Sequence, residues 1–354
     1  MVLGRWLLVT AASAGSGLLL LSSLGWALAH PGGGADGAVV RLGWCLIPVL
    51  VTVQLAVAVG RAQPAGWPRT GLSAVGLGRT GVVMLAAACA AVTCTLGSAV
   101  ALAVFLQLRG DVVGVPWNGV GPGLLAAGRP LPPAGAITLL ALVPVAAAAA
   151  TAFRLREERP PAHDAPGTLP WGVSLVAVGL AAELTAPSGH EVPLPSGLGS
   201  ISPAALAAWA VTAIGMVLAG PGIVHLCGRL TASFRPGAVR LLAGRALQYE
   251  ARRIGYPLGL LCATASAALA AWDGAHALGP VSSFAAALIA VCVLATSALA
   301  LTETRNARTA PRAALHAVAA SPAVLRGAVA VRAGVLFAVL VPVTVLVAAL
   351  STYP

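Results

Sequence analysis

The chain has 354 residues, of which 58% are apolar and 9% are charged, and its mean hydropathy is strongly positive. Because a soluble domain carries roughly a quarter charged residues, this composition indicates a membrane protein. All 21 basic residues are Arg, which excludes a Walker A phosphate loop and a pyridoxal Schiff base, since both need a Lys side chain. The net charge of +11 comes from short basic stretches between apolar runs, a pattern typical of bilayer orientation rather than nucleic-acid binding.

Nine stretches of the chain are apolar and long enough to cross a bilayer, which takes about 20 residues of helix. The first begins after Arg5 and ends in small residues before His30, a pattern that also fits a secretory signal peptide. We expect this stretch to be retained as a span. In chain order the predicted spans are residues 6–28, 42–60, 82–107, 134–153, 169–186, 203–227, 256–272, 281–302 and 333–350.

The arginines are distributed asymmetrically along these spans. If the N-terminus is cytoplasmic, 18 of the 21 Arg lie on cytoplasmic segments, and only Arg41, Arg109 and Arg129 lie outside. The positive-inside rule therefore predicts a multi-pass protein of the cell membrane with a cytoplasmic N-terminus. Nine spans place the C-terminus outside, whereas a tenth would return it to the cytoplasm. The outer segments are short and rich in Gly and Pro, so we expect soluble partners to dock from the cytoplasm.

Two of the cytoplasmic segments resemble each other. Residues 69–76 read RTGLSAVG and residues 312–319 read RAALHAVA, with four of the eight positions identical. Each segment lies between two apolar spans and leads through a short turn into the next span. An internal repeat of this kind is common in transporters, in which two related helical bundles frame the path of the substrate.

The arginine, the short amphipathic stretch and the long span that follows resemble the FtsX/MacB-like ABC transporter permease domain. The resemblance covers roughly residues 42–107 and 281–350, and the helix pair between them is similar to that of bacitracin-exporter-like permeases, which carry both units in one chain. It implies that both segments contact a cytoplasmic ABC ATPase, present in two copies. That subunit would bind ATP and Mg²⁺, so this chain needs no cofactor of its own. The chain departs from the family in lacking an acidic residue before Leu72 and Leu315, a fourth helix in the second unit, and a large extracytoplasmic domain.

The expected fold is all-α: a polytopic integral membrane protein with about nine to ten transmembrane helices, two related helical units and a central helix pair. The division is residues 1–153 for the first FtsX-like unit, 154–228 for the central pair, and 229–354 for an interfacial helix and the second unit. The interfacial helix is expected within residues 229–255, which hold six Arg and one acidic residue. We expect the central pair to be peripheral, because helices joined directly to a docked segment receive the motion of the partner.

Within the two matched segments, Leu72 and Val75, and likewise Leu315 and Val318, share one helical face at i and i+3. Such a face can enter a groove of a soluble partner, with the Arg three residues earlier at its rim. The alternative is a pair of ordinary Arg-rich loops at anionic headgroups. The predicted ATPase-docking residues are Arg69, Leu72, Val75, Gly76, Arg312, Leu315, Val318 and Ala319.

Glu183 is the one acidic residue placed within a predicted span, and a charge at membrane depth is costly enough to suggest a function. It is therefore a candidate intramembrane polar site for substrate or proton handling. Because it lies shortly before Pro187, the alternative is that it simply reaches the outer interface. The six Cys and six His are scattered without the spacing of a metal site, and no catalytic set is evident, so we expect neither a metal nor an enzymatic activity.

Together these features predict the permease subunit of an ATP-driven transporter that exports or extracts a hydrophobic or amphipathic compound, such as a lipid, peptide or antibiotic. Its expected partners are the ATPase and the lipid bilayer, and no nucleic acid. Two alternatives stay open. A secondary transporter should carry charged or broken helices near the membrane middle, and a non-transporting scaffold or sensor would use the same cytoplasmic segments to hold a partner.

Overall fold

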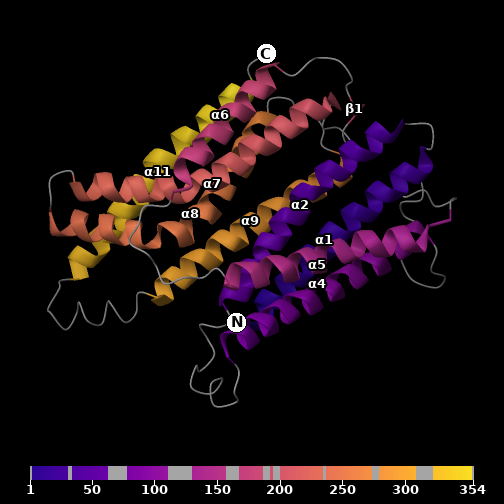
Figure 1. Cartoon of the computed structure of the whole chain (residues 1–354), viewed down its shortest axis with the longest axis horizontal. Coiled ribbons are helices and arrows are strands. Elements are labelled where there is room, and N and C mark those ends of the chain that lie inside the picture. The colour runs from indigo at the N-terminus through magenta and orange to yellow at the C-terminus, as the bar shows by residue number, and fades with distance from the viewer. Residues whose placement is uncertain are drawn as a thin grey trace. The chain divides into compact units, whose positions relative to one another are not determined.

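The computed structural model is helical throughout the residues that it describes, apart from two paired strands of two residues each (Figure 1). It describes residues 2–30, 34–62, 78–110, 130–156, 167–185, 192–193, 200–233, 237–272, 279–307 and 322–352. The elements are α1 (Val2–Ala29), α2 (Gly34–Ala62), α4 (Arg79–Arg109), α5 (Pro133–Arg156), α6 (Leu169–Thr185), β1 (Val192–Pro193), β2 (Ser200–Ile201), α7 (Pro203–Ser233), α8 (Ala238–Trp272), α9 (Pro280–Ala307) and α11 (Pro322–Thr352).

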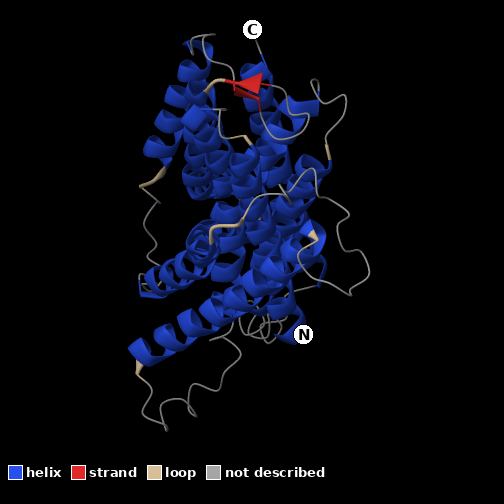
Figure 2. Cartoon of the chain, turned by 90° about the vertical axis from the view of Figure 1, so that its right-hand side faces the viewer, coloured by secondary structure: helices blue, strands red, loops and turns tan. Residues whose placement is uncertain are grey.

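Each of the nine predicted spans falls on one of these helices. Among the described residues, eight helices are long and apolar enough to cross a membrane, whereas α6 has 17 residues and is shorter. A helix of that length rises about 26 Å, slightly less than the hydrocarbon core of about 30 Å. The described residues are almost entirely helical (Figure 2), which together with the eight long apolar helices confirms the prediction of an all-helical, polytopic membrane protein.

Four helices begin at a proline, which suits the first helical position because its missing N–H would have no partner there. These residues are Pro133, Pro203, Pro280 and Pro322. Helix α11 therefore starts well before the predicted span 333–350, and its first turns contain Arg326 and Arg332, which hydropathy alone assigns to a loop.

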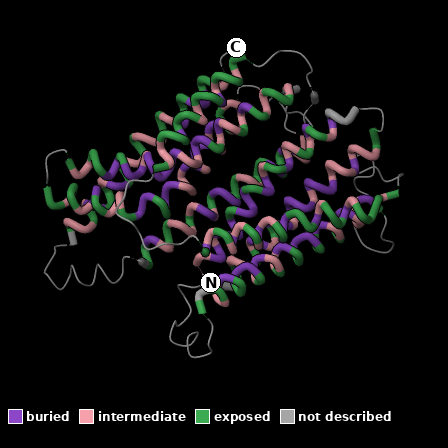
Figure 3. The backbone as a smooth tube through the Cα atoms, viewed as in Figure 1, coloured by how far each residue is buried: buried purple, intermediate pink, exposed green. Residues whose placement is uncertain are grey.

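Exposed positions alternate with buried ones along the helices (Figure 3), and many of the exposed residues are large and apolar. On α4, Leu96 and Val100 are 56% and 49% exposed, and on α11 Phe337 is 71% exposed. Soluble proteins do not display long helix faces of this kind, because apolar surface in water costs free energy. These faces are suited to lipid.

The chain divides into two compact units, each with its own core. Unit 1 comprises Met1–Glu158, Val192–Ser200 and His276–Cys292, and unit 2 comprises Arg159–Glu191, Ile201–Ala275 and Val293–Pro354. Unit 1 thus holds α1, α2, α4 and α5, unit 2 holds α6, α7, α8 and α11, and α9 contributes to both. This division differs from the expected one, because the central pair α6 and α7 packs with α8 and α11. Helix α7 is not peripheral within unit 2, since it contacts all three of these helices.

Small residues and hydroxyl groups hold unit 1 together. Gly97 of α4 lies against Ser13 of α1, and a Cβ at Gly97 would come within 2.7 Å of the Ser13 Cβ. The Ser13 hydroxyl donates to the Cys94 carbonyl at 2.8 Å, and the Ser98 hydroxyl donates to the Leu140 carbonyl of α5 at 3.0 Å. Close backbone approach and interhelical hydrogen bonds are the usual means of helix association in a bilayer.

The helix register places the basic helix ends of unit 1 together. Gly60, near the end of α2, packs against Thr151, near the end of α5, and Val83, near the start of α4, packs against Leu155. The starts of α1 and α4 and the ends of α2 and α5 therefore share one end of the unit. Four arginines of these turns are Arg5, Arg61, Arg154 and Arg156.

Unit 2 is assembled around glycines of α7. Gly220 lies directly on the Gly255 carbonyl of α8, and a Cβ at Gly228 would lie 2.7 Å from the Gly244 carbonyl of the same helix. On the other side of α7, Gly215 packs against the backbone of α6. Any larger side chain at these positions would push the helices apart, so glycine sets the spacing of the whole unit.

Arg-rich turns also share one end of unit 2. Helices α7 and α8 are antiparallel, because Gly228 meets Gly244 whereas Gly220 meets Gly255, and α11 starts at the same end as α8, because Gly327 packs against Val239. The arginines in this half of the described helices are Arg229, Arg240, Arg245, Arg252, Arg253, Arg326 and Arg332. The described residues at the opposite end of unit 2, 176–185, 203–213, 262–272 and 341–352, contain no basic residue.

The expected interfacial helix takes a different form. Helix α8 runs from Ala238 to Trp272 without interruption, and its 35 residues include most of the Arg-rich segment. Leu247 and Ala251 of this segment pack against Val224 of α7 and are buried, whereas Tyr249 is 60% exposed. The segment therefore extends the α7–α8 hairpin instead of forming a separate helix.

Candidate functional site

The predicted ATPase-docking residues lie outside the described part of the chain. Arg69, Leu72, Val75 and Gly76 fall within residues 63–77, and the second set, Arg312, Leu315, Val318 and Ala319, falls within residues 308–321. The structure does show which helices follow them. The first segment leads into α4 of unit 1, and the second leads into α11 of unit 2.

Glu183, the candidate intramembrane polar residue, lies in the last turn of α6. Its carboxylate oxygens are almost inaccessible although the residue as a whole is only partly buried, and the Thr212 hydroxyl is the polar group that acts on the carboxylate. An acid at membrane depth is costly unless its charge is compensated. Such a residue is a candidate binding group.

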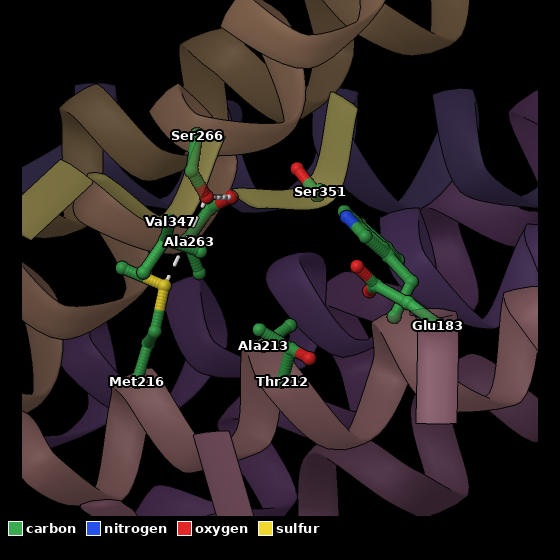
Figure 4. Close-up of a pocket in the computed structure, with 9 residues that line it drawn as sticks. Glu183, Thr212, Ala213, Met216, Ala263, Ser266, Val347 and Ser351 are labelled. Atoms are coloured by element: carbon green, nitrogen blue, oxygen red, sulfur yellow. Dashed lines mark hydrogen bonds between the residues drawn. The ribbon is translucent and has the colours of Figure 1, made fainter. Parts of the chain in front are cut away.

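The Glu183 carboxylate borders a small pocket within unit 2 (Figure 4). The lining side chains leave no space large enough for a water molecule between them. In Figure 4 the carboxylate turns toward the space framed by Thr212 and Ser351, and Met216 lies on the far side. Four helices contribute the lining residues, which are Glu183, Trp209, Thr212, Ala213, Met216, Ala263, Ser266, Val347 and Ser351.

The hydroxyl groups of this pocket bond to the carbonyls of their own helices. Thr212 donates to the Ala208 carbonyl at 3.1 Å, Ser266 to the Ala263 carbonyl at 2.9 Å, and Ser351 to the Ala348 carbonyl at 2.9 Å. The Ser266 hydroxyl also lies 3.8 Å from the Met216 sulfur, the other acceptor to which it can donate (Figure 4).

The position of Glu183 follows from the tight packing of α6 on α7. Gly179, one turn earlier, has no room for a Cβ because the Thr212 hydroxyl occupies that space. This contact holds the last turn of α6 beside the start of α7 and directs the carboxylate inward. The sequence identified the acid, but the three other helices of the pocket lie far from it along the chain.

A second charged group was missed by the sequence interpretation. Glu250 of α8 and Arg332 of α11 form an ion pair of 3.1 Å, and their side chains are only 8% and 10% exposed. Both residues had been assigned to cytoplasmic segments on the basis of charge. The signal was present in the sequence, since Glu250 is the only acidic residue among the arginines of 229–255. The pair ties the first turns of α11 to α8.

The described residues contain no group of three His, Cys, Asp or Glu side chains that could hold a metal ion. The candidate site is therefore the single-carboxylate pocket of unit 2. No protein-family model, curated protein or solved structure matches the chain, so the functional argument depends on this geometry and on the sequence.

Proposed function

We propose that the chain is the membrane-spanning subunit of an ATP-driven transporter whose ATPase is a separate cytoplasmic protein. One observation carries the proposal. The two matched segments, 69–76 and 312–319, lead into different units, the first into α4 and the second into α11. A partner bound to both segments would act on each unit separately, as a transporter that alternates between two states requires.

The helix packing supports transmission of motion from the segments. Helix α11 is joined to α8 by the Glu250–Arg332 pair shortly after its start. Helix α4 packs along α1 and α5 through Gly97 and Ser98. A displacement of either segment would therefore move a packed group of helices rather than one isolated helix.

The charges support the proposed orientation. In each unit the arginine-rich turns gather at the end from which α4 or α11 begins, and this is the end next to the matched segments. Placing these ends in the cytoplasm satisfies the positive-inside rule and puts both segments within reach of a soluble ATPase. The proposal therefore includes a cytoplasmic N-terminus in the cell membrane and two ATPase copies per chain.

The test is whether an ATPase depends on both segments for its association. The full chain is purified in mild detergent with its ATPase, and the bound amount is compared with that of a variant carrying Leu72→Asp, Val75→Asp, Leu315→Asp and Val318→Asp. We expect the variant to remain monodisperse and to lose most of the ATPase, since each Asp places a charge on the docking face.

A matched control adds four Asp on a predicted outer segment, at Val112, Val113, Leu124 and Leu125. This control should retain the ATPase. Undiminished association with the variant of the two matched segments would contradict the proposal. A secondary transporter, the main alternative, would move its substrate without any ATPase.

A further inference from the structure

Arg41 lies at the end of unit 1 opposite to the arginine-rich turns. It is in the second turn of α2, beside the last turns of α1. Only three of the 21 Arg fall on predicted outer segments, and Arg41 is one of them. Because the positive-inside rule does not explain an arginine at this end, its contacts show what it can do there.

An indole ring positions the Arg41 side chain. The guanidinium carbon lies 3.8 Å from the centre of the Trp26 ring, at which distance the cation is attracted by the π face of the indole. His30 stacks on the same indole, with ring centroids 4.7 Å apart, and its Nδ1 lies 3.1 Å from the Trp26 carbonyl oxygen. Trp26 is therefore a fixed platform on α1 for a charge that comes from α2.

The nitrogens of Arg41 lack an anionic partner among the described residues. The Nε atom is inaccessible and has no hydrogen-bond acceptor, whereas the two terminal nitrogens are accessible. The side chains that the structure describes in unit 1 include no Asp or Glu. Asp36, the nearest acid along the chain, is five positions earlier, which is not the i, i+3 or i, i+4 spacing of helical pairs.

We propose that Arg41, stacked on Trp26, binds the phosphate group of a phospholipid in the leaflet around this end of unit 1. A guanidinium presents two terminal N–H groups side by side, and this fork matches two oxygens of one phosphate. Stacking covers the face of the group and leaves its edge free for the ligand. No cavity is required, because the phosphate meets this edge from the headgroup layer.

The surroundings favour a lipid over a soluble anion. Leu42 and Leu46 of α2 are 38% and 49% exposed, so this part of the helix presents apolar side chains to acyl chains. Tryptophan is enriched at the headgroup level of a bilayer, and Trp26 and Trp44 both lie near this end of the α1–α2 hairpin. Phosphodiesters are abundant at that depth, whereas free phosphate has to come from the water.

Lipid binding at this site goes beyond the proposed transport function and requires neither ATP nor an ATPase. It is measured on the full chain alone. Failure of the lipid proposal and failure of the ATPase proposal therefore give different results.

The experiment uses a phosphatidylglycerol that carries a diazirine in its headgroup and the purified chain in dodecyl maltoside, a detergent without phosphate. After illumination and digestion with trypsin, mass spectrometry counts the label within residues 22–46, the last turns of α1 and the first turns of α2. We expect labelling that saturates with lipid concentration. Unlabelled phosphatidylglycerol should displace it, whereas dioleoylglycerol, which has no phosphate, and 10 mM inorganic phosphate should not.

Three variants test the named side chains. Arg41→Gln should raise the half-saturating lipid concentration at least tenfold. Arg41→Lys, which keeps the charge but loses the fork, should raise it several-fold, and so should Trp26→Leu, which removes the platform. The matched control Arg5→Gln removes one charge at the opposite end of unit 1 and should stay within twofold of the unaltered chain.

Selectivity separates lipid binding from a purely structural contact between α1 and α2. If Arg41 only holds the two helices together, Arg41→Gln will leave the preference for phosphatidylglycerol over dioleoylglycerol unchanged, and the proposal is overturned. Labelling that does not saturate, or displacement by inorganic phosphate as effective as that by the lipid, would also overturn it. Trp26→Leu keeps the test decisive if Arg41→Gln is not monodisperse, because unchanged affinity in that variant contradicts the platform.

Discussion

The buried Glu250–Arg332 pair gives the sharpest energetic prediction. The Arg332 guanidinium donates to the Glu250 carboxylate at 3.1 Å, with both side chains about nine-tenths buried between α8 and α11. Replacing Arg332 with Met keeps an unbranched apolar stem but leaves the carboxylate without this partner. Replacing Glu250 with Gln leaves the guanidinium without its counter-charge. The double variant removes both charges.

The expected magnitude follows from the distance and the burial. At 3.1 Å and an effective dielectric constant of about 20, two unit charges attract by about 5 kcal/mol. Desolvation offsets part of this attraction, and breaking a buried pair from one side costs roughly 3–5 kcal/mol in soluble proteins. We therefore predict a loss of about 3 kcal/mol for each single variant, about 1 kcal/mol for the double variant, and a coupling energy well above 1 kcal/mol.

Cysteine labelling measures this loss within unit 2. Cys262 of α8 is 4% exposed in a cluster with Met216 and Val347, so a maleimide reaches it only when the unit opens. With the other cysteines replaced by Ala, the labelling rate of Cys262 should rise roughly a hundredfold in Arg332→Met, since each 1.4 kcal/mol is a factor of ten. A parallel chain that retains only Cys94, which is buried in unit 1, should label at an unchanged rate.

Two outcomes would refute the reasoning. The first is a coupling energy below about 0.5 kcal/mol in the double-mutant cycle, which would be typical of an exposed surface pair. The second is an equal effect of Arg326→Met, because Arg326 lies on the same helix but is exposed. Either result would mean that the pair does not anchor α11 to α8.

Two further predictions concern packing and topology. Gly220→Ala should destabilise unit 2 by about 2 kcal/mol, because the added Cβ would collide with the Gly255 carbonyl. Gly334→Ala should have almost no effect, since nothing lies within 4 Å of a Cβ at that position. Equal labelling rates of Cys262 in the two variants would contradict this difference. Nine spans place Pro354 outside the cell, so a C-terminal tag should be removed by protease added to intact cells, and a protected tag would show that a span was miscounted.

The sequence predicted the helices well, because the hydropathy and the length of a segment decide whether it can cross a bilayer. The structure packs α1 against α4 through small residues, pairing Gly97 with Ser13 and Gly17 with Ala101. In a chain so rich in alanine, small residues alone could not identify these partners. Partner choice depends on the positions of whole helices, which a local pattern does not encode.

Charged residues show where local patterns are insufficient. The rule that assigns arginines to loops treated Arg332 as a membrane-surface charge, whereas Glu250 on α8 neutralises it inside unit 2. The Arg-rich part of α8 was expected to be an interfacial helix, but it continues without interruption into the following span, and its Leu247 and Ala251 pack against α7. For Glu183, the sequence supplied the acid, while Trp209, Ser266 and Ser351 reach the same pocket only through the tertiary packing of α7, α8 and α11.

The most direct test of the proposed function is the ATP hydrolysis rate of the partner ATPase with and without this chain. Both proteins are reconstituted in liposomes, with the quadruple variant Leu72→Asp, Val75→Asp, Leu315→Asp and Val318→Asp as the matched control. The proposal predicts that the unaltered chain changes the hydrolysis rate several-fold, whereas the variant leaves it unchanged. An ATPase rate that is the same with the unaltered chain, with the variant and with empty liposomes would contradict it.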